Sequence, residues 1–202
     1  MGTGYGLTET SGSVAQAVGE DFIRNRTAAG RVLSLVDMKI DAPAGQAGEI
    51  MVRGPMVMQG YWNRPEETAA VLSADGWFRT GDIGTVDSEG YVFIVDRKKD
   101  MVISGGENIY CAEVERIMGA MDGVAECAAF GIPDERLGEL LVAFVVASGV
   151  TEKDIIEEVG EKLARYKAPG QVRFVNDPLP RNAVGKVDKI NLRAMWPDLA
   201  GV

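Results

Sequence analysis

The stretch that decides the fold is Asp96-Arg97-Lys98-Lys99-Asp100, followed after Met101-Val102-Ile103 by Ser104-Gly105-Gly106-Glu107-Asn108. Short segments rich in β-forming residues precede it. Apolar runs alternating with helical patterns follow it. A charged run between two differently patterned regions is typical of an exposed linker, and a Gly-Gly pair permits unusual backbone angles and close approach of a ligand. We therefore predict two domains, residues 1–96 and residues 97–202.

The first region has the pattern of a small β-rich domain. Strands are predicted at residues 31–40, 48–53, 57–62, 77–86 and 91–96, and the last two should form a hairpin across 87–90. Asn63 and Pro65 predict the start of a short helix that runs to about Leu72. Residues 1–13 show no hydrophobic period, so we expect a loop there. Short strands at this spacing favour a small barrel or sandwich.

The second region predicts a compact α+β domain with a roughly three-stranded sheet. Apolar runs at 124–132, 140–147 and 172–175 favour strands. Helices are predicted at 112–121, after the capping-box pattern of Thr151-Glu152-Lys153-Asp154, and at 188–195 before Pro197. The fold class expected for the whole chain is α+β, with a barrel-like first part.

Composition excludes several classes of function. The chain has 202 residues, a formal net charge of −9 and no histidine. The charge argues against nucleic acid as a partner, and the lack of histidine removes Ser-His-Asp and Cys-His nucleophiles. No apolar run reaches the ~20 residues that span a bilayer, so no transmembrane segment is expected. Cys111 and Cys127 have no metal-site spacing and are interpreted as reduced thiols of a cytoplasmic protein.

Positive charge collects near the end of the chain. Residues 162–193 contain eight Lys or Arg residues and only two acids. Such a region suits a small polyanion, although a solvated helix-and-loop face has the same composition. Within it, Pro180-Arg181-Asn182-Ala183-Val184-Gly185-Lys186-Val187-Asp188-Lys189 places a flexible cation directly after a glycine in a polar loop. Lys186 is therefore our candidate for meeting an anion bound elsewhere.

Four segments in this order resemble the adenylate-forming enzymes, the family of acyl-CoA synthetases, luciferases and peptide-synthetase adenylation domains. They are Tyr5-Gly6-Leu7-Thr8-Glu9-Thr10, Gly76-Trp77-Phe78-Arg79-Thr80-Gly81-Asp82, the stretch 96–108 and the lysine loop. The resemblance implies that Tyr5 flanks adenine, Thr8 meets the α-phosphate and Glu9 binds Mg²⁺. It also implies that Asp82 holds the ribose hydroxyls, Arg97 contacts ribose or phosphate, and Lys186 is the catalytic cation.

The same resemblance implies a two-step reaction. A carboxylic acid and ATP give an acyl-adenylate, and a thiol, expected to be that of coenzyme A, then displaces AMP. Lys99 occupies the family's hinge position, and Gly105 and Gly106 would line the coenzyme A channel. Residues 1–96 would be the end of the large AMP-binding domain, and residues 97–202 its mobile carboxyl-terminal domain. A fatty acid is the expected acid.

The sequence departs from a complete enzyme of this family. The Ser/Thr/Gly-rich phosphate loop is absent, and Thr8 to Ser13, the nearest analogue, lacks its lysine. We therefore expect an upstream domain of the same protein to be a partner and the isolated chain to be inactive. Two alternatives stay open: an adenylation domain that loads a carrier protein, and a noncatalytic nucleotide-binding or interaction module.

Overall fold

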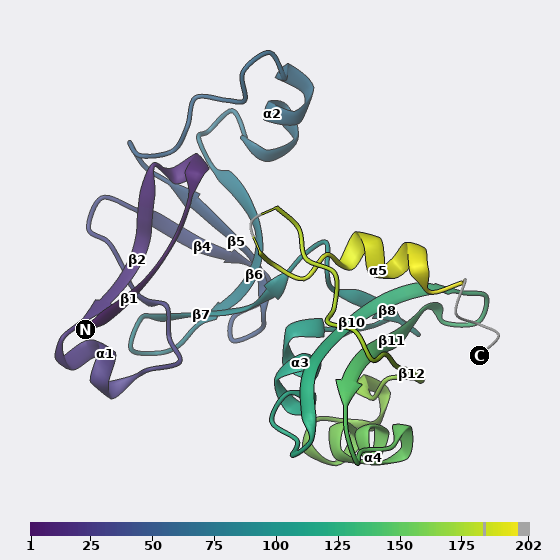
Figure 1. The fold of residues 1–202 in the computed structure, drawn as a ribbon. Coiled ribbons are helices and arrows are strands. Elements are labelled where there is room, and N and C mark those ends of the chain that lie inside the picture. The colour runs from purple at the N-terminus through teal and green to yellow at the C-terminus, as the bar shows by residue number, and fades with distance from the viewer. Residues whose placement is uncertain (184, 198–202) are drawn as a thin grey trace. The chain divides into compact units, whose positions relative to one another are not determined.

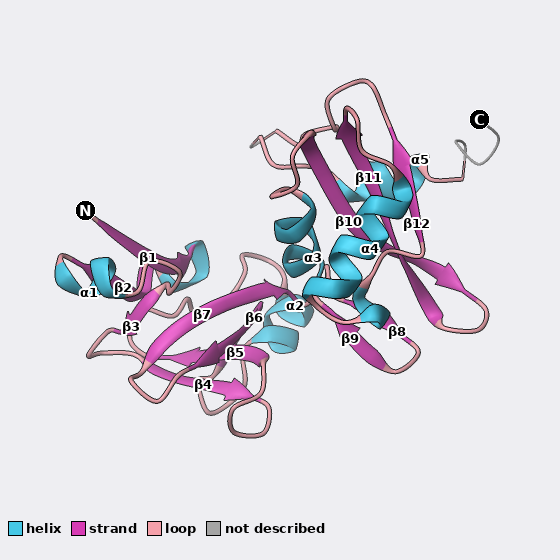
Figure 2. Ribbon diagram, turned by 90° about the horizontal axis from the view of Figure 1, so that it is seen from below, coloured by secondary structure: helices cyan, strands magenta, loops and turns pink. Residues whose placement is uncertain are grey.

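The chain forms two compact units, Met1–Lys99 and Asp100–Val202. The computed structural model describes residues 1–183 and 185–197, which Figure 1 draws along the chain and Figure 2 draws by secondary structure. We call the units the amino-terminal and the carboxyl-terminal unit. Both contain strands and helices, so the predicted α+β class is confirmed.

The amino-terminal unit is built around one seven-stranded antiparallel sheet with the strand order β1-β2-β3-β7-β6-β5-β4. Its elements are β1 (Gly2–Leu7), the 3-10 turn η1 (Thr8–Thr10), β2 (Gly12–Val18), α1 (Glu20–Arg24), β3 (Gly30–Val32), β4 (Asp37–Asp41), β5 (Gly48–Arg53), α2 (Pro65–Val71), β6 (Phe78–Val86) and β7 (Tyr91–Arg97). Among the described strands β1 and β4 end the order without pairing with each other. The sheet is therefore open, and the expected barrel is not confirmed.

The core of this unit lies against the strands that the sequence predicted most clearly. Ile50 and Val52 of β5 pack with Phe78 of β6 and Val92 of β7. The predicted hairpin is confirmed, because β6 and β7 pair in antiparallel fashion across the turn at 87–90. This core fixes the two strands that carry candidate site residues, with Asp82 in the middle of β6 and Arg97 at the end of β7.

Three predictions for this unit are wrong. Residues 1–13 are not a loop, because β1 pairs along its length with β2, and this pairing supplies the order that an apolar pattern would otherwise supply. The strand predicted at 31–40 is interrupted by a turn between β3 and β4. The segment 57–62 is an irregular loop with bends and not a strand. The N-cap of α2 is Arg64, and Asn63 before it has a positive φ of 53°.

The carboxyl-terminal unit contains a five-stranded sheet, two strands more than expected. Its elements are β8 (Val102–Ser104), β9 (Glu107–Ile109), α3 (Cys111–Met118), β10 (Val124–Asp134), β11 (Gly138–Ala147), α4 (Glu152–Lys162), the 3-10 turn η2 (Arg165–Lys167), β12 (Gln171–Phe174) and α5 (Lys189–Met195). The order is β10-β11-β8-β9, and β12 pairs in parallel with β11. The two additional strands, β8 and β9, form a short hairpin around Gly105 and Gly106.

Both faces of this sheet are buried under helices, as Figure 1 shows. On one face, α3 and α4 pack against Leu141, Ala143 and Val145 of β11. On the other face, α5 packs against Phe130 of β10 and Phe144 of β11. Alternate residues of one strand thus belong to opposite layers, as the two-residue period of a strand requires. Within the part of the chain that the structure describes, no helix is long and apolar enough to cross a membrane.

Candidate functional site

Five predicted site residues line one pocket of the amino-terminal unit. Tyr5, Thr8, Glu9, Asp82 and Arg97 all border it, and its volume is about 770 Å³. They come from β1, η1, β6 and β7, and up to 92 positions separate them in the sequence. A pocket of this size lies in the range that small-molecule ligands occupy. The structure therefore brings together residues that the sequence could relate only through their resemblance to a family.

Asp82 is the centre of this pocket. Its carboxylate accepts a hydrogen bond from the Tyr5 hydroxyl at 2.8 Å and pairs with the Arg97 guanidinium at 3.2 Å. Asp82 is 5% exposed, whereas the Arg97 side chain is half-exposed. Because a carboxylate can accept about four hydrogen bonds, two further donors can still bind Asp82. Two vicinal hydroxyl groups of a sugar match that remaining capacity.

The strand register places Asp82 and Arg97 side by side. They are direct partners in the β6–β7 ladder, so one side of the pocket is built into the sheet. Tyr5 is held at the other side. Burial, followed by the nearby negative charge of Asp82, raises the pKa of the Tyr5 phenol above its ordinary value. Tyr5 therefore stays protonated and acts as a hydrogen-bond donor at neutral pH.

Glu9 borders the same pocket on η1. Its carboxylate accepts a hydrogen bond from the Tyr61 hydroxyl at 3.0 Å, and its backbone carbonyl accepts one from Met58 at 2.7 Å. Burial, with the Glu9 hydrogen bond, raises the pKa of Tyr61. Within the described residues, no group of three His, Cys, Asp or Glu side chains is arranged to hold a metal ion. A single carboxylate beside a phosphate site nevertheless fits Mg²⁺, which is commonly bound by one or two carboxylates with substrate phosphates and water.

A second pocket continues from the first towards the end of the amino-terminal unit. Its volume is about 440 Å³, and Leu7, Glu9 and Arg97 line both pockets. Lys98 and Lys99 line only the second one. The predicted hinge residue therefore lies beside the candidate nucleotide pocket, two residues after Arg97.

Lys186 lies in a tightly closed loop of the carboxyl-terminal unit. Asn182 binds both backbone groups of Lys186. The Asn182 N–H donates to the Lys186 carbonyl at 2.8 Å, and the Lys186 N–H donates to Asn182 Oδ1 at 3.0 Å. Arg181 and Val187 form a β-bridge at the base of the loop. The Lys186 side chain is exposed and forms no ion pair with the residues that the structure describes.

Much of the positive charge around Lys186 is neutralised by carboxylates of the same unit. The Lys189 ammonium lies 2.8 Å from Glu115 and is largely buried. Burial acts to lower the pKa of Lys189, but the charge of Glu115 outweighs it and the pKa is raised. Arg181 pairs with Glu126 at 3.2 Å and donates to the Gly185 carbonyl at 3.1 Å. These two cations therefore support the loop, and Lys186 presents its charge to solvent.

Gly105 and Gly106 form the two-residue turn of the β8–β9 hairpin. Their φ angles are 59° and 87°, the positive values that a tight hairpin of this kind requires. The Gly105 N–H donates to the Leu137 carbonyl at 2.8 Å, and the Ile103 N–H donates to the Glu139 carboxylate at 2.8 Å. The predicted glycine segment is thus a fixed turn on the edge of the sheet.

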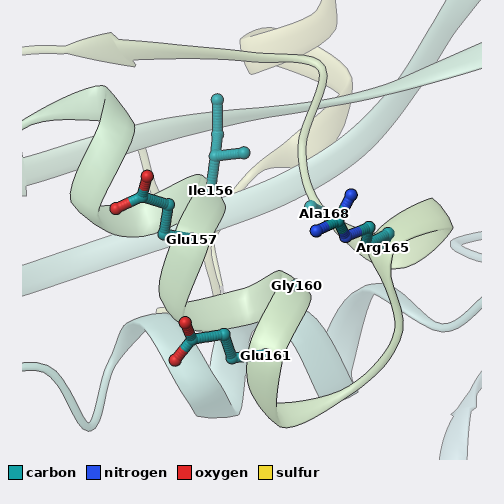
Figure 3. Close-up of a pocket in the computed structure, with 6 residues that line it drawn as sticks. All are labelled: Ile156, Glu157, Gly160, Glu161, Arg165 and Ala168. Atoms are coloured by element: carbon teal, nitrogen blue, oxygen red, sulfur yellow. The ribbon is translucent and has the colours of Figure 1, made fainter.

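A further hollow in the carboxyl-terminal unit lies between α4 and η2, with a volume of about 440 Å³ (Figure 3). Glu157 and Glu161 of α4 and Arg165 of η2 line it, and Ile156, Gly160 and Ala168 complete the lining. None of the predicted site residues is among these residues. The hollow therefore takes no part in the candidate site.

The sequence analysis missed three polar residues that adjoin the residues lining the candidate nucleotide pocket. Tyr61 binds Glu9, Thr10 is buried and closes η1 through bonds to the Leu7 and Gly12 carbonyls, and Glu49 is buried in β5. Glu49 had a detectable signal, because it is the only charged residue in the apolar run Gly48-Glu49-Ile50-Met51-Val52. A charge in such a run is expected to be buried and paired.

Comparison with known protein families agrees with this geometry. The AMP-binding enzyme family matches residues 1–62, and the AMP-binding enzyme C-terminal domain matches residues 113–186. Together these matches cover more than half of the chain. The chain therefore belongs to the AMP-binding, adenylate-forming enzymes.

Named relatives are acid–CoA ligases. The chain is 44% identical over 200 residues to long-chain-fatty-acid–CoA ligase FadD13 of Mycobacterium tuberculosis, covering 96% of this chain and 39% of that protein. It is 50% identical over 194 residues to a 3-[(3aS,4S,7aS)-7a-methyl-1,5-dioxo-octahydro-1H-inden-4-yl]propanoyl:CoA ligase of Rhodococcus jostii, covering 95% and 37%. The structure of o-succinylbenzoate CoA synthetase from Bacillus subtilis with its acyl-adenylate intermediate is similar, with a TM-score of 0.86, 35% identity and coverage of 95% and 40%. The chain thus spans about two fifths of the length of these relatives.

Proposed function

We propose that this chain is the carboxyl-terminal part of an ATP-dependent acid–CoA ligase. The observation that carries the proposal is the cluster of Tyr5, Asp82 and Arg97, which lines one pocket with Thr8 and Glu9. The relatives named above, all of which are ligases of this class, support it. An upstream domain of the same protein would supply the rest of the site.

In this proposal the pocket binds the nucleotide. Asp82 accepts bonds from the ribose 2′- and 3′-hydroxyls, which its two remaining acceptor positions allow. Arg97 adds a guanidinium that contacts ribose or phosphate. The Tyr5 ring flanks adenine while its hydroxyl stays on Asp82, and the Thr8 hydroxyl binds an α-phosphate oxygen. Glu9 would hold Mg²⁺, which offsets phosphate charge.

The first half-reaction joins two anions. An oxygen of the acid's carboxylate attacks the α-phosphorus of ATP, and the bond from that phosphorus to the pyrophosphate oxygen breaks. Lys186 would stabilise the negative charge that develops on the α-phosphoryl oxygens. Its exposed side chain on a closed loop suits this role, since the backbone is fixed while the ammonium can reach outward.

The second half-reaction needs a thiol at the acyl carbon of the adenylate that the first half-reaction forms. The sulfur of coenzyme A attacks the acyl carbonyl, the bond to the AMP phosphate oxygen breaks, and the thiol proton is lost. Gly105 and Gly106 would line the path of the pantetheine arm, because a turn without side chains permits close approach. Between the two steps, rotation at Lys99 would withdraw Lys186 from the reacting group and bring the Gly105–Gly106 turn to it.

The identity of the acid is a separate part of the proposal. A fatty acid is our candidate, and FadD13 is one relative named for such a substrate. The other two relatives described above are named for ring-containing acids, so a panel must include both kinds. We place the enzyme in the cytoplasm, where ATP and coenzyme A are found together and where cysteines outside a disulfide, such as Cys111 and Cys127, stay reduced.

The test is ATP–pyrophosphate exchange and acyl-CoA formation by the full-length protein that contains this chain. We expect acid-dependent exchange followed by release of AMP and an acyl-CoA. Asp82→Asn should raise the KM for ATP about tenfold, because a charge-assisted hydrogen bond is lost. Asp75→Asn, in an exposed turn, is the matched control and should leave the KM unchanged.

Other outcomes would replace the proposal. Exchange followed by transfer only to a carrier protein's thiol would identify an adenylation domain of the carrier-loading kind. Nucleotide binding without exchange for any acid would identify a noncatalytic nucleotide-binding module. The isolated 202-residue chain should give no turnover, and robust exchange by that chain alone would contradict the need for an upstream domain.

A further inference from the structure

A bulge in β6 aims Asp82 into the pocket. In the β5–β6 ladder Glu49 pairs with Ile83, and Met51 pairs with Arg79. Ile50 alone lies between the two pairs on β5, whereas Thr80, Gly81 and Asp82 lie between them on β6. Extra residues of this kind bend a strand and redirect its side chains, and they leave backbone groups without ladder partners. Some other group must satisfy them.

Two side chains form hydrogen bonds with backbone groups at the bulge. The Thr80 hydroxyl donates to the Ile50 carbonyl at 2.8 Å and accepts from the Asp82 N–H at 3.1 Å. The Glu49 carboxylate accepts from the Gly81 N–H at 3.2 Å. Gly81 has a φ of 71°, so a residue with a side chain would be strained there. The backbone next to Asp82 is therefore held on both sides.

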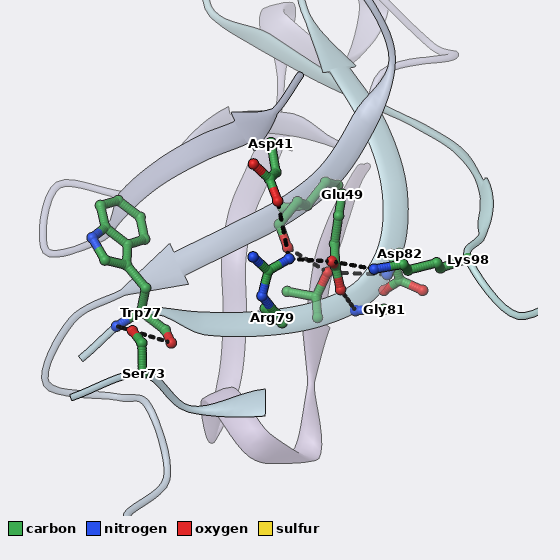
Figure 4. A network of polar contacts seen from close by, with 10 residues as sticks. Asp41, Glu49, Ser73, Trp77, Arg79, Gly81, Asp82 and Lys98 are labelled. Carbon is green, nitrogen blue, oxygen red and sulfur yellow. Dashed lines mark hydrogen bonds and ion pairs between the residues drawn. The ribbon is translucent and has the colours of Figure 1, made fainter. Parts of the chain in front are cut away.

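Glu49 is held in turn by two cations, as Figure 4 shows. Its Oε2 atom accepts from Arg79 at 2.7 Å and from Lys98 at 2.9 Å, and the residue is 7% exposed. Burial acts to raise the pKa of Glu49, but hydrogen bonds from Lys98 and Arg79 outweigh it and lower the pKa below its ordinary value. The carboxylate is thus ionised at neutral pH and accepts three hydrogen bonds, from Arg79, Lys98 and the Gly81 N–H.

Lys98 connects this cluster to the segment before the hinge. Its side chain binds Glu49, and its backbone N–H donates to the Gly81 carbonyl at 2.8 Å. Gly81 and Lys98 are therefore tied to each other directly and also through one carboxylate. Lys99, the next residue along the chain, is the proposed pivot.

We propose that Glu49 is a positioning residue that fixes both Asp82 and the stationary side of the pivot. It holds the bulge that presents Asp82 to the ribose, and it anchors Lys98 so that rotation starts at Lys99. This inference rests on the proposed function for its catalytic consequence. Its structural part, the tie between residue 81 and residue 98, can be tested without catalysis.

The structural test is amide hydrogen exchange, measured by NMR on the 202-residue chain. Glu49→Gln should speed exchange at Gly81 and Lys98 about tenfold, the effect of losing a charge-assisted bond, while Val92 in the core keeps its protection. Lys98→Met, at a half-exposed position, should fold normally and speed exchange of the backbone amide at position 98. Asp41→Asn is the matched control, because Asp41 also binds Arg79 but neither Gly81 nor Lys98.

Equal loss of protection across the sheet, or no change at residues 81 and 98, would overturn the structural part. The catalytic test uses the full-length ligase. Glu49→Gln should raise the KM for ATP about tenfold through Asp82, and Lys98→Met should slow thioester formation more than adenylation. If Asp82→Asn leaves the KM unchanged, the proposed function fails. If Asp82→Asn raises the KM and Glu49→Gln does not, only this inference fails.

Discussion

Single residues in this chain owe their chemistry to what holds them in place. Asp82 is presented by a bulge and bound by Tyr5 and Arg97, and Lys186 is exposed on a loop that Asn182 closes. Asp82 is a buried hydrogen-bond acceptor, whereas Lys186 is an exposed cation. We therefore expect different results when each side chain is removed.

Lys186→Ala in the full-length ligase should cripple adenylation and spare thioester formation from supplied acyl-adenylate. A preorganised cation of this kind is commonly worth about 3–4 kcal/mol in a transition state, so kcat for adenylation should fall roughly 10²–10³-fold. Single-turnover assays of each half-reaction measure the split. Lys153→Ala, on the exposed face of α4, is a suitable control. Equal loss in both half-reactions would reject the role of Lys186.

Cys127 should make the stability of the chain depend on pH in the alkaline range. Burial, followed by the charge of Glu115, raises the pKa of its thiol to about 11. In the unfolded chain a cysteine thiol has a pKa of about 8.5. Because the unfolded state loses its proton first, the native state loses stability as the pH rises from about 9 to 11, by about 1–2 kcal/mol at pH 10.

Urea unfolding at pH 8, 9 and 10 measures this loss. Cys127→Ala should show a smaller decline between pH 8 and pH 10 than the unsubstituted chain. Because other groups titrate in the same range, the comparison between the two proteins carries the result. An identical decline in both would show that Cys127 does not contribute.

At the level of helices and strands, local signals in the sequence predicted the carboxyl-terminal unit well. The capping box at Thr151 is confirmed: the Thr151 hydroxyl accepts from the Asp154 N–H, and the Asp154 carboxylate accepts from the Thr151 N–H. The strands predicted from the apolar runs at 124–132 and 140–147 are also confirmed, as β10 and β11. These runs are apolar throughout because both faces of that sheet are buried.

Thr151→Ala should lower the free energy of unfolding of the carboxyl-terminal unit by about 1 kcal/mol, because it removes an N-cap acceptor. Thr151→Ser keeps the acceptor and is the control. Urea unfolding followed by a probe in this unit, such as Trp196 fluorescence, measures the difference. If the alanine and serine variants unfold at the same urea concentration, the cap does not stabilise this unit.

Elements that depend on distant partners were missed. β1 consists of Gly2-Thr3-Gly4-Tyr5-Gly6-Leu7, which has low strand propensity, and it is a strand because β2 pairs with it. β8 and β9 have three residues each, too short for a period to be visible. Their Gly-Gly turn was nevertheless a hairpin signal, whereas we interpreted the pair as a place for unusual backbone angles and close approach of a ligand.

The candidate site could be predicted only in part for a similar reason. Tyr5, Asp82 and Arg97 lie in segments with recognisable patterns, and the fold brings them together. Glu49 belongs to no such pattern. Its position depends on the register of β5 against the bulge in β6, and a register of that kind follows from packing and not from local sequence.

Over the whole molecule, the two units have separate hydrophobic cores. Val14, Ile50 and Phe78 belong to the core of the amino-terminal unit, and Val114 and Leu141 belong to that of the carboxyl-terminal unit. Units with their own cores commonly move relative to one another unless a large apolar interface joins them. This organisation is what a reaction by domain alternation requires.

Lys99→Pro in the full-length ligase should therefore slow thioester formation far more than adenylation. Proline fixes φ near −65° and restricts the preceding residue, so the backbone at the proposed pivot loses its freedom to rotate. Rates of the two half-reactions, measured separately, give the comparison. Lys39→Pro is unsuitable as a control because it disrupts β4, whereas Lys99→Ala keeps a flexible backbone and should behave like the unsubstituted enzyme. Matching rates in the proline variant would exclude Lys99 as the pivot.

The open seven-stranded sheet has one further consequence, for the handling of the chain in solution. Its two margins differ: β4 carries Asp37, Lys39 and Asp41, whereas β1 carries no charged residue. Charges on an edge strand discourage the addition of a foreign strand, and an uncharged edge lacks this protection. At high concentration, self-association of purified chains should therefore begin along β1, where main-chain groups can extend the sheet into a neighbouring copy.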